Sequence, residues 1–172
     1  MQVIYLYGAP AIGKRTVANK LAKITNFKVV DNHIHTPIAL RFFTNSSKWY
    51  WELRKRIREA IFEIAAEAKI PGLILTGVYE SKDIKEIKYL VEYFRRLGAE
   101  VFFFHLTCSD EERKQRVVGE DRKDKQLRTV EKLRPNKLFS KIKGIKHTTL
   151  DITKMSPEST AKHIRDLMKK QK

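Results

Sequence analysis

The sequence predicts an α/β fold in which helices cover both faces of a five-stranded parallel sheet, in a three-layer α/β/α arrangement. Short apolar runs alternate with longer segments of helical periodicity, and a glycine-containing turn follows the first run. A parallel strand is buried on both faces and reaches its neighbour through a helical crossover, which accounts for the alternation. With 172 residues, no internal repeat and no linker, we expect one domain over 1–172.

The first three elements run from the start of the chain to Asp31. Residues 3–7 are apolar and end at Gly8, which is typical of a buried parallel strand. Residues 14–25 place apolar side chains on one face at helical spacing and predict a helix. A second apolar run at 27–30 predicts the next strand, which ends at the aspartate.

A long helix, a strand and a shorter helix fill the middle of the chain. Residues 47–69 are amphipathic at helical period, and the Pro-Gly pair at 71–72 stops the helix. The continuous apolar run at 73–78 predicts the third strand. Residues 81–97 predict a helix that ends at Gly98, a residue type common just beyond helix ends.

A basic segment interrupts the pattern in the last third of the chain. Residues 100–107, rich in Phe, predict the fourth strand, and a helix over 109–118 begins with Ser109 as N-cap. Residues 119–146 hold many Lys and Arg and few apolar residues, so we expect a mobile basic lid with one short helix near 129–134.

The chain closes with a fifth strand over 147–152 and a last helix opened by Ser156 and Pro157, which suit the N-cap and first helical positions. The single cysteine, Cys108, excludes an internal disulfide and a Cys-based zinc site. No apolar stretch reaches the ~18 residues of a membrane span, so we expect a cytoplasmic protein without a membrane partner.

Charge favours anionic partners. Lys and Arg number 36 against 20 acidic residues, a net charge of +16. The excess is consistent with binding nucleotides, phosphorylated metabolites or nucleic acid, and equally with a solvated Lys-rich surface.

A phosphate-binding loop lies between the first predicted strand and helix. The spacing Gly-x-x-x-x-Gly-Lys matches the Walker A core. Glycines let backbone N–H groups point at phosphate oxygens, the helix N-terminus adds a positive dipole end, and the lysine supplies a cation for the β- and γ-phosphates. The expected nucleotide-binding residues are Gly8, Ala9, Pro10, Ala11, Ile12, Gly13, Lys14, Arg15 and Thr16.

The loop departs from the usual pattern at one position. Arg15 stands directly after Lys14, where Ser or Thr normally ligates Mg²⁺, and Thr16 follows. Adenylate kinases, with Gly-Lys-Gly-Thr, also lack a hydroxyl directly after the lysine. We therefore expect Mg²⁺ to be held mainly through water, with Thr16 as a metal or α-phosphate contact.

Several segments together resemble the nucleoside monophosphate kinase fold, nearest its shikimate kinase-like branch and small uncharacterised kinases within it. They are residues 7–18, 31–33, 75–77 and 150–153 with 156–158. The resemblance implies a five-stranded parallel sheet, a lid over the nucleotide, and transfer of a phosphoryl group from ATP to a small acceptor. It also implies that the loop holding Asp151 and Thr153 meets the adenine ring.

Candidate acceptor residues follow the second and third strands. Asp31 either takes a proton from an acceptor hydroxyl, holds Mg²⁺ through water, or merely caps the next helix. His33 either contacts the acceptor or is a plain loop residue, and with His35 alone it makes a poor zinc site. Thr76 and Gly77 end the third strand, where the glycine either admits substrate to the backbone or simply turns the chain.

Further candidates lie on two helices. Arg54 and Arg58, one turn apart, either bind an acidic substrate group or form a solvated face, which we favour. For the aromatic cluster at 49–51 we favour core packing over lining a pocket or stacking a base. Arg122 and, after it, Arg116 are the expected catalytic cations, since phosphoryl transfer spreads negative charge that such groups offset.

The sequence therefore predicts an ATP- and Mg²⁺-dependent kinase in which Lys14 holds phosphates and Asp31 activates a small hydroxylated or anionic acceptor. Three alternatives remain. A nucleoside monophosphate kinase is disfavoured because the third strand lacks Asp-Gly-x-Pro-Arg. An NTP-dependent RNA- or DNA-binding protein is favoured by the charge and by Trp49 and Trp51. A non-catalytic nucleotide-binding module is favoured by Arg15 and the missing Walker B acid.

Overall fold

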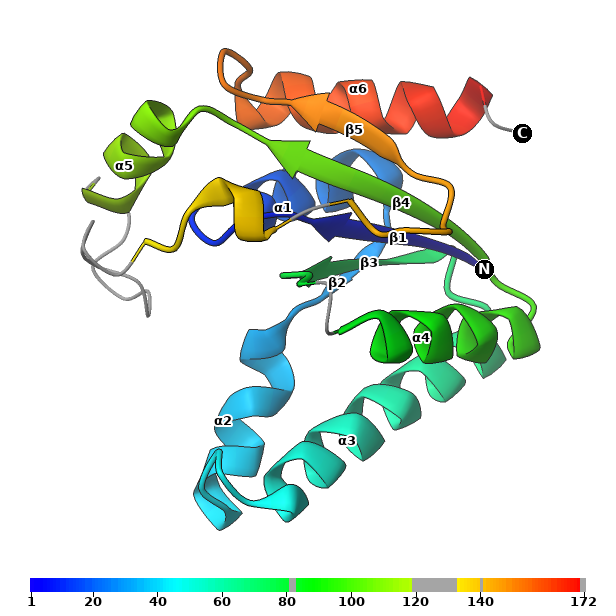
Figure 1. Cartoon of the computed structure of the whole chain (residues 1–172). Helices are drawn as coiled ribbons and strands as arrows, with labels where there is room; N and C mark the ends of the chain where they lie inside the picture. Colours follow the sequence, from blue (N-terminus) through cyan, green and yellow to red (C-terminus); the bar gives the residue numbers. More distant parts are fainter. Residues whose placement is uncertain (81–82, 119–132, 140, 171–172) are drawn as a thin grey trace.

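The computed structural model describes residues 1–80, 83–118, 133–139 and 141–170, without the side chains at 32, 33 and 137. A five-stranded, all-parallel sheet in the order β2-β3-β1-β4-β5 lies between helices (Figure 1). The predicted fold class is confirmed. The strands are β1 Gln2–Tyr7, β2 Lys28–Val30, β3 Gly72–Gly77, β4 Glu100–Thr107 and β5 Thr148–Asp151; the helices are α1 Lys14–Thr25, α2 Asn32–Phe42, α3 Lys48–Glu67, α4 Ile84–Arg96, α5 Asp110–Val118 and α6 Pro157–Lys170, with a 3₁₀ turn η4 at Asn136–Leu138.

The central strand β1 feeds two separate hydrophobic cores. Ile4 and Leu6 point to one face, where they pack with α1 and α6. Val3, Tyr5 and Tyr7 point to the opposite face and pack with α3 and α4. Burial of a large apolar side chain stabilises a fold by roughly 1.5–3 kcal/mol, so both layers hold the sheet. Because alternate residues of β1 are buried on opposite faces of the sheet, the strand appears in the sequence as an unbroken apolar run.

The carboxyl end of β1 is the natural place for a ligand. From β1 the chain crosses to β2 on one side of the sheet, and from the adjacent strand β3 it crosses to β4 on the other side. The ends of β1 and β3 therefore form the topological switch point of the sheet. The phosphate loop continues directly from β1 into α1, and β2 and β3 end beside it.

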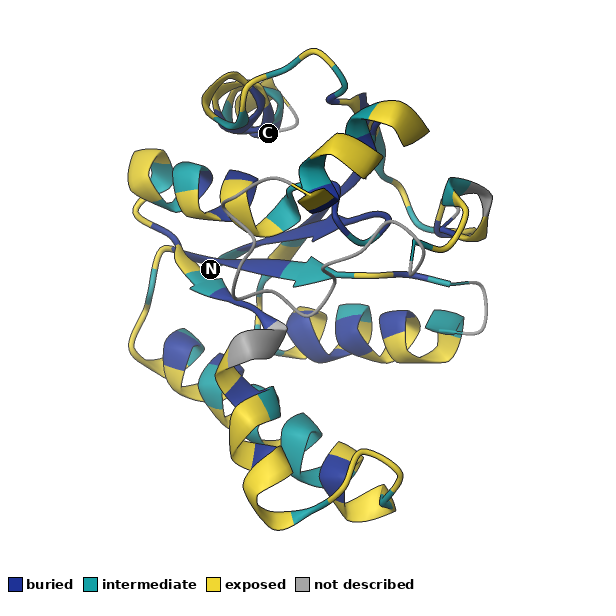
Figure 2. Ribbon diagram, turned by 90° about the vertical axis from the view of Figure 1, so that its left-hand side faces the viewer, coloured by how far each residue is buried: buried dark blue, intermediate teal, exposed yellow. Residues whose placement is uncertain are grey.

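Helix α2 was not predicted. It contains Pro37, and its apolar residues Ile38, Leu40 and Phe42 are exposed, so the sequence offers no amphipathic pattern. The helix is stabilised instead by packing against α3. The two form an arm that projects from the sheet, with a largely exposed surface (Figures 1 and 2).

The aromatic cluster on this arm differs from expectation. Tyr50 is buried, but Trp49 and Trp51 are 55% and 57% exposed, so the prediction of core packing is wrong for both tryptophans. Lys48 lies over Trp49 and Arg54 over Trp51, which keeps both rings in contact with cations at the surface.

Most of the predicted basic lid lies outside the described residues, including Arg122, Lys125 and most of the short helix expected near 129–134. Residues 133 and 134 have no regular structure, and η4 follows them. Within the described ranges, no helix combines the length and hydrophobicity needed to cross a membrane.

Candidate active site

Backbone geometry explains the glycines of the phosphate loop. Gly8 and Gly13 have φ of 148° and 97°, in the region that side chains disfavour, and Ala11 is left-handed at 69°. A Cβ at Gly8 would also collide with the carbonyl oxygen of Leu106. The chain therefore turns sharply from β1 into α1 between close neighbours, as a phosphate-binding loop requires.

The loop and the first turn of α1 are suited to an anion. The N-cap of α1 is Gly13, which has no side chain to cap the helix, and the first turn holds no acidic residue. Lys14 Nζ donates to the carbonyl oxygens of Gly8 at 2.9 Å and Ala9 at 2.7 Å, so the ammonium group lies over the loop. Amides at a helix N-terminus and a cation beside them form an anion site. Thr16 is exposed on the same turn.

Asp31 is held close to the loop by the unexpected arginine. Arg15 Nε lies 2.9 Å from Asp31 Oδ2, and the aspartate is 6% exposed while the Arg15 side chain is about half exposed. The carboxylate thus lies at the carboxyl end of β2, facing the first turn of α1.

A cavity of about 280 Å³ opens on the α3/α4 side of the sheet. Four of the predicted substrate residues line it: Arg54, Arg58, Thr76 and Gly77. The structure therefore brings together residues from α3 and the end of β3 that are distant in sequence. His33 was also predicted to contact the acceptor, and its side chain is outside the described residues.

His35 lines the same cavity and is neutral. It is 1% exposed, and Arg54 Nε donates to its Nδ1 at 3.2 Å. Burial, and then the charges of Arg54 and Arg58, lower the pKa of His35 to about 4, while the charge of Asp31 opposes the shift. Asp31 is therefore near enough to influence a residue of the cavity wall.

Gly77 is required for packing. A Cβ at this position would collide with the hydroxyl and ring of Tyr5 on the neighbouring strand β1. This packing role adds to the two roles that the sequence suggested, and the predicted substrate contact of Gly77 stays a prediction. Tyr5 itself, together with Asp83 and Glu86 from α4 and its N-cap, completes the wall and was not predicted. The only sequence signals for these residues were the odd-numbered positions of the β1 segment and the amphipathic pattern of the α4 segment.

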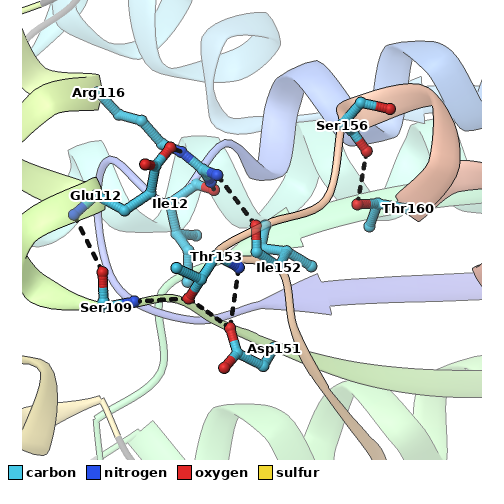
Figure 3. A network of polar contacts seen from close by, with 9 residues as sticks. All are labelled: Ile12, Ser109, Glu112, Arg116, Asp151, Ile152, Thr153, Ser156 and Thr160. Carbon is cyan, nitrogen blue, oxygen red and sulfur yellow. Dashed lines mark hydrogen bonds and ion pairs between the residues drawn. The ribbon is translucent and has the colours of Figure 1, made fainter.

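Arg116 connects the phosphate loop, α5 and the loop after β5 (Figure 3). Its guanidinium donates to the carbonyl oxygens of Ile12 at 2.7 Å and Ile152 at 3.1 Å, and to Glu112 Oε1 at 2.7 Å. The side chain thus joins the phosphate loop to α5 and to the loop after β5. Its three hydrogen bonds give it a structural role between these segments, and its predicted catalytic role stays a prediction.

The loop after β5 is ordered by its own hydrogen bonds. The backbone N–H and hydroxyl of Thr153 both donate to Asp151 Oδ1, at 2.9 and 2.6 Å, and Ser109 N donates to Thr153 Oγ1 (Figure 3). These hydrogen bonds lower the pKa of Asp151. Both residues predicted to meet adenine are therefore fixed next to Arg116.

Other polar residues are structural. Arg113 is 1% exposed and donates to Asn136 Oδ1 and to the carbonyl oxygen of Arg134, which holds the segment around η4 against α5. Arg134 pairs with Glu80 in turn. The guanidinium of Arg113 is therefore used in holding the structure together.

A histidine and a cysteine are buried beside the loop. His105 stacks on Tyr7, and burial lowers its pKa; burial likewise raises the pKa of the Cys108 thiol. In the part of the chain that the structure describes, no three His, Cys, Asp or Glu side chains gather as metal ligands.

Comparison with known proteins yields fold relatives and no sequence relatives. No family model matches the chain, and no curated protein matches it. Among solved structures it is similar to a proposed kinase from Chloroflexus aurantiacus, with a TM-score of 0.69 at 12% identity over 99% of this chain and 97% of the other. A sugar kinase from Janibacter sp. gives 0.63 at 14% identity over 98% and 95%. Shikimate kinase from Acinetobacter baumannii, in complex with shikimate, gives 0.59 at 20% identity over 99% and 94%.

All three likenesses span nearly the full length of both chains. Since each identity lies below 25%, they establish the fold and no more. The chain adopts the fold that these structures share, as the resemblance of its phosphate loop and strand ends to the shikimate kinase-like branch implied.

Proposed function

We propose that this protein is an ATP-dependent kinase that transfers the γ-phosphoryl group to a hydroxyl of a small molecule, in the cytoplasm. One observation carries the proposal. A phosphate loop and a separate cavity open at the same edge of the sheet, and Asp31 lies close to both, paired with Arg15 and influencing His35. A kinase needs a donor site, an acceptor site and a carboxylate between them.

The donor side would act by positioning and charge. Loop amides and Lys14 would hold the β- and γ-phosphates, and Arg116 would keep the loop aligned with Asp151 and Thr153 beside the base. Arg122 remains a proposed transition-state cation.

Mg²⁺ fits the available donors. The hydroxyl of Thr16 and the carboxylate of Asp31 are oxygen ligands, which this ion prefers, and Mg²⁺ usually keeps several waters. Thr16 and Asp31 would hold it, mainly through water. The ion would supply neutralisation of the phosphate charge, while Asp31 orients the acceptor hydroxyl or accepts its proton.

The test is an ATP-consumption screen over hydroxylated metabolites, nucleosides, nucleoside monophosphates and RNA ends, with phosphorylated products identified by mass spectrometry. We expect turnover that needs both ATP and an acceptor and that Lys14→Ala abolishes. Lys23→Ala, on the exposed last turn of the same helix, is the matched control. ATP binding without turnover on any acceptor would favour the non-catalytic module instead.

A nucleic-acid-binding role is the second candidate, and the exposure of Trp49 and Trp51 favours it. Each ring lies beside a cation, an arrangement suited to stacking an unpaired base. Single-stranded RNA should then quench tryptophan fluorescence, with an affinity that falls steeply with salt. Absence of quenching at low salt would remove this candidate.

A further inference from the structure

We infer that the cavity takes a neutral polyhydroxylated acceptor, of sugar or cyclitol type, in preference to a carboxylic acid or a phosphate ester. The inference rests on the proposed kinase function and specifies its acceptor. It runs against the net charge of +16, which by itself would favour an anion.

The local charge of the cavity is opposite to that of the whole protein. Among its described lining residues, the cations are Arg54 and Arg58, and the carboxylates are Glu59, Asp83 and Glu86. His35 adds no positive charge at neutral pH, because its pKa is lowered to about 4. The described wall is thus slightly negative, and a second anion placed in it would be repelled.

Both arginines are already engaged. Arg58 donates to Glu86 Oε1 at 3.0 Å, so an anion that took this guanidinium would leave Glu86 unpaired. Arg54 donates to His35 and lies 4.9 Å from the Trp51 ring centroid. An anionic acceptor would have to break these interactions, whereas a hydroxyl can join them by donating to the carboxylate.

Tyr5 supplies a hydroxyl at the cavity wall. Its side chain is 8% exposed, and its OH makes no hydrogen bond with any residue that the structure describes. Burial raises the pKa of Tyr5, so the group stays protonated and available as a donor. A hydroxyl ligand both donates and accepts, and it therefore matches a wall that offers a phenol and carboxylates side by side.

The dimensions agree with a small ring. A volume of about 280 Å³ lies just below the ~300–1,000 Å³ of drug-sized ligand pockets. The apolar side chains of Phe62 and Leu90 line part of the wall, and the exposed side chains of Tyr89 and Trp51 line another part. Apolar and aromatic surfaces beside a few polar groups suit the C–H faces of a polyol.

Matched pairs of ligands test the inference. Each neutral compound is compared with an acid of the same carbon skeleton: glucose with gluconate, xylitol with xylonate, and a cyclic polyol with quinate. Binding to the protein with a non-hydrolysable ATP analogue is measured by calorimetry, and phosphorylation by mass spectrometry. We expect the preferred neutral member to bind at least about tenfold more tightly than its acid.

Two variants assign the preference to the named residues. Glu86→Gln frees Arg58 and should shift the neutral-to-acid ratio towards the acid by about tenfold. Tyr5→Phe should weaken binding of the neutral member while the ring contact with Phe103 is kept. Glu92→Gln, an exposed position on the same helix outside the cavity, should change neither.

The outcomes separate the two proposals. Tighter binding and phosphorylation of the acids would overturn the polyol inference and leave the kinase proposal intact. Neutral ligands that bind, respond to both variants and are never phosphorylated would support the inference and overturn the kinase. If no member of any pair binds, or if Glu86→Gln leaves the ratio unchanged, the inference is wrong.

Discussion

Arg15 Nε lies 2.9 Å from Asp31 Oδ2, so the residue that replaces the usual hydroxyl of the phosphate loop holds the carboxylate at the end of β2. The departure from the Walker A pattern thereby has a structural explanation. The chain gives up a direct metal-ligating hydroxyl and gains a positioned carboxylate at the edge where the acceptor would enter.

Replacing Arg15 by Gln should lower kcat/KM by roughly 10- to 100-fold, because Asp31 loses the group that orients it. Stability should change by less than about 1 kcal/mol, since the arginine is half exposed. Steady-state kinetics and denaturant unfolding check both values. Arg15→Lys should recover part of the rate, and full activity in Arg15→Gln would contradict the positioning role.

Gly77→Ala should destabilise the protein by about 1–3 kcal/mol through overpacking against Tyr5. A double-mutant cycle with Tyr5→Val measures this directly in urea unfolding. The two losses should be less than additive, because the smaller side chain makes room for the new methyl group. Strict additivity would show that the two residues do not compete for space.

Arg116→Ala should weaken ATP binding by about tenfold, because the phosphate loop and the loop after β5 lose their shared donor. Arg116→Lys should restore little of the ATP affinity, because one ammonium group does not reproduce a planar guanidinium that donates to three acceptors. Calorimetry with ATP measures both, beside the exposed control Arg95→Ala. Unchanged affinity would place the nucleotide elsewhere.

Stability should fall as pH drops from about 6.5 towards 4. The pKa of His35 is lower in the folded protein than in the unfolded chain, so the unfolded state binds the proton more readily. The contribution of His35 to the free energy of unfolding is fully present above pH 6.5, and it amounts to at most about 3 kcal/mol. Urea midpoints across pH 4–7.5 should show a smaller slope in His35→Gln than in the wild type or His163→Gln. Equal slopes would show that His35 titrates normally.

The sequence predicted the framework better than the acceptor site. Strands appear as apolar runs because both faces are buried, and the phosphate loop follows from glycines that the backbone requires. Helix α2 was not predicted because Pro37 and the exposed apolar residues leave no amphipathic helical pattern in its sequence. Packing against α3, which a local pattern does not reveal, stabilises it.

The cavity wall was only half predictable for a related reason. Arg54 and Arg58 share one helix face and were visible as a pair. Tyr5 comes from β1, which pairs with β3, and Asp83 and Glu86 come from the start of α4. The pairing of β1 with β3 and the crossover from β3 into α4 bring them to the arginines. Local sequence patterns do not reveal contacts between elements that are distant in the chain.

The division of β1 into two sides has one more consequence. Its even-numbered residues support the layer of α1, which begins at the phosphate loop, and its odd-numbered residues support the layer that encloses the cavity. Substitutions can therefore accumulate in one layer while the other keeps its packing. For the proposed kinase, substitutions in the cavity layer would change the acceptor while the layer behind the phosphate loop keeps its packing.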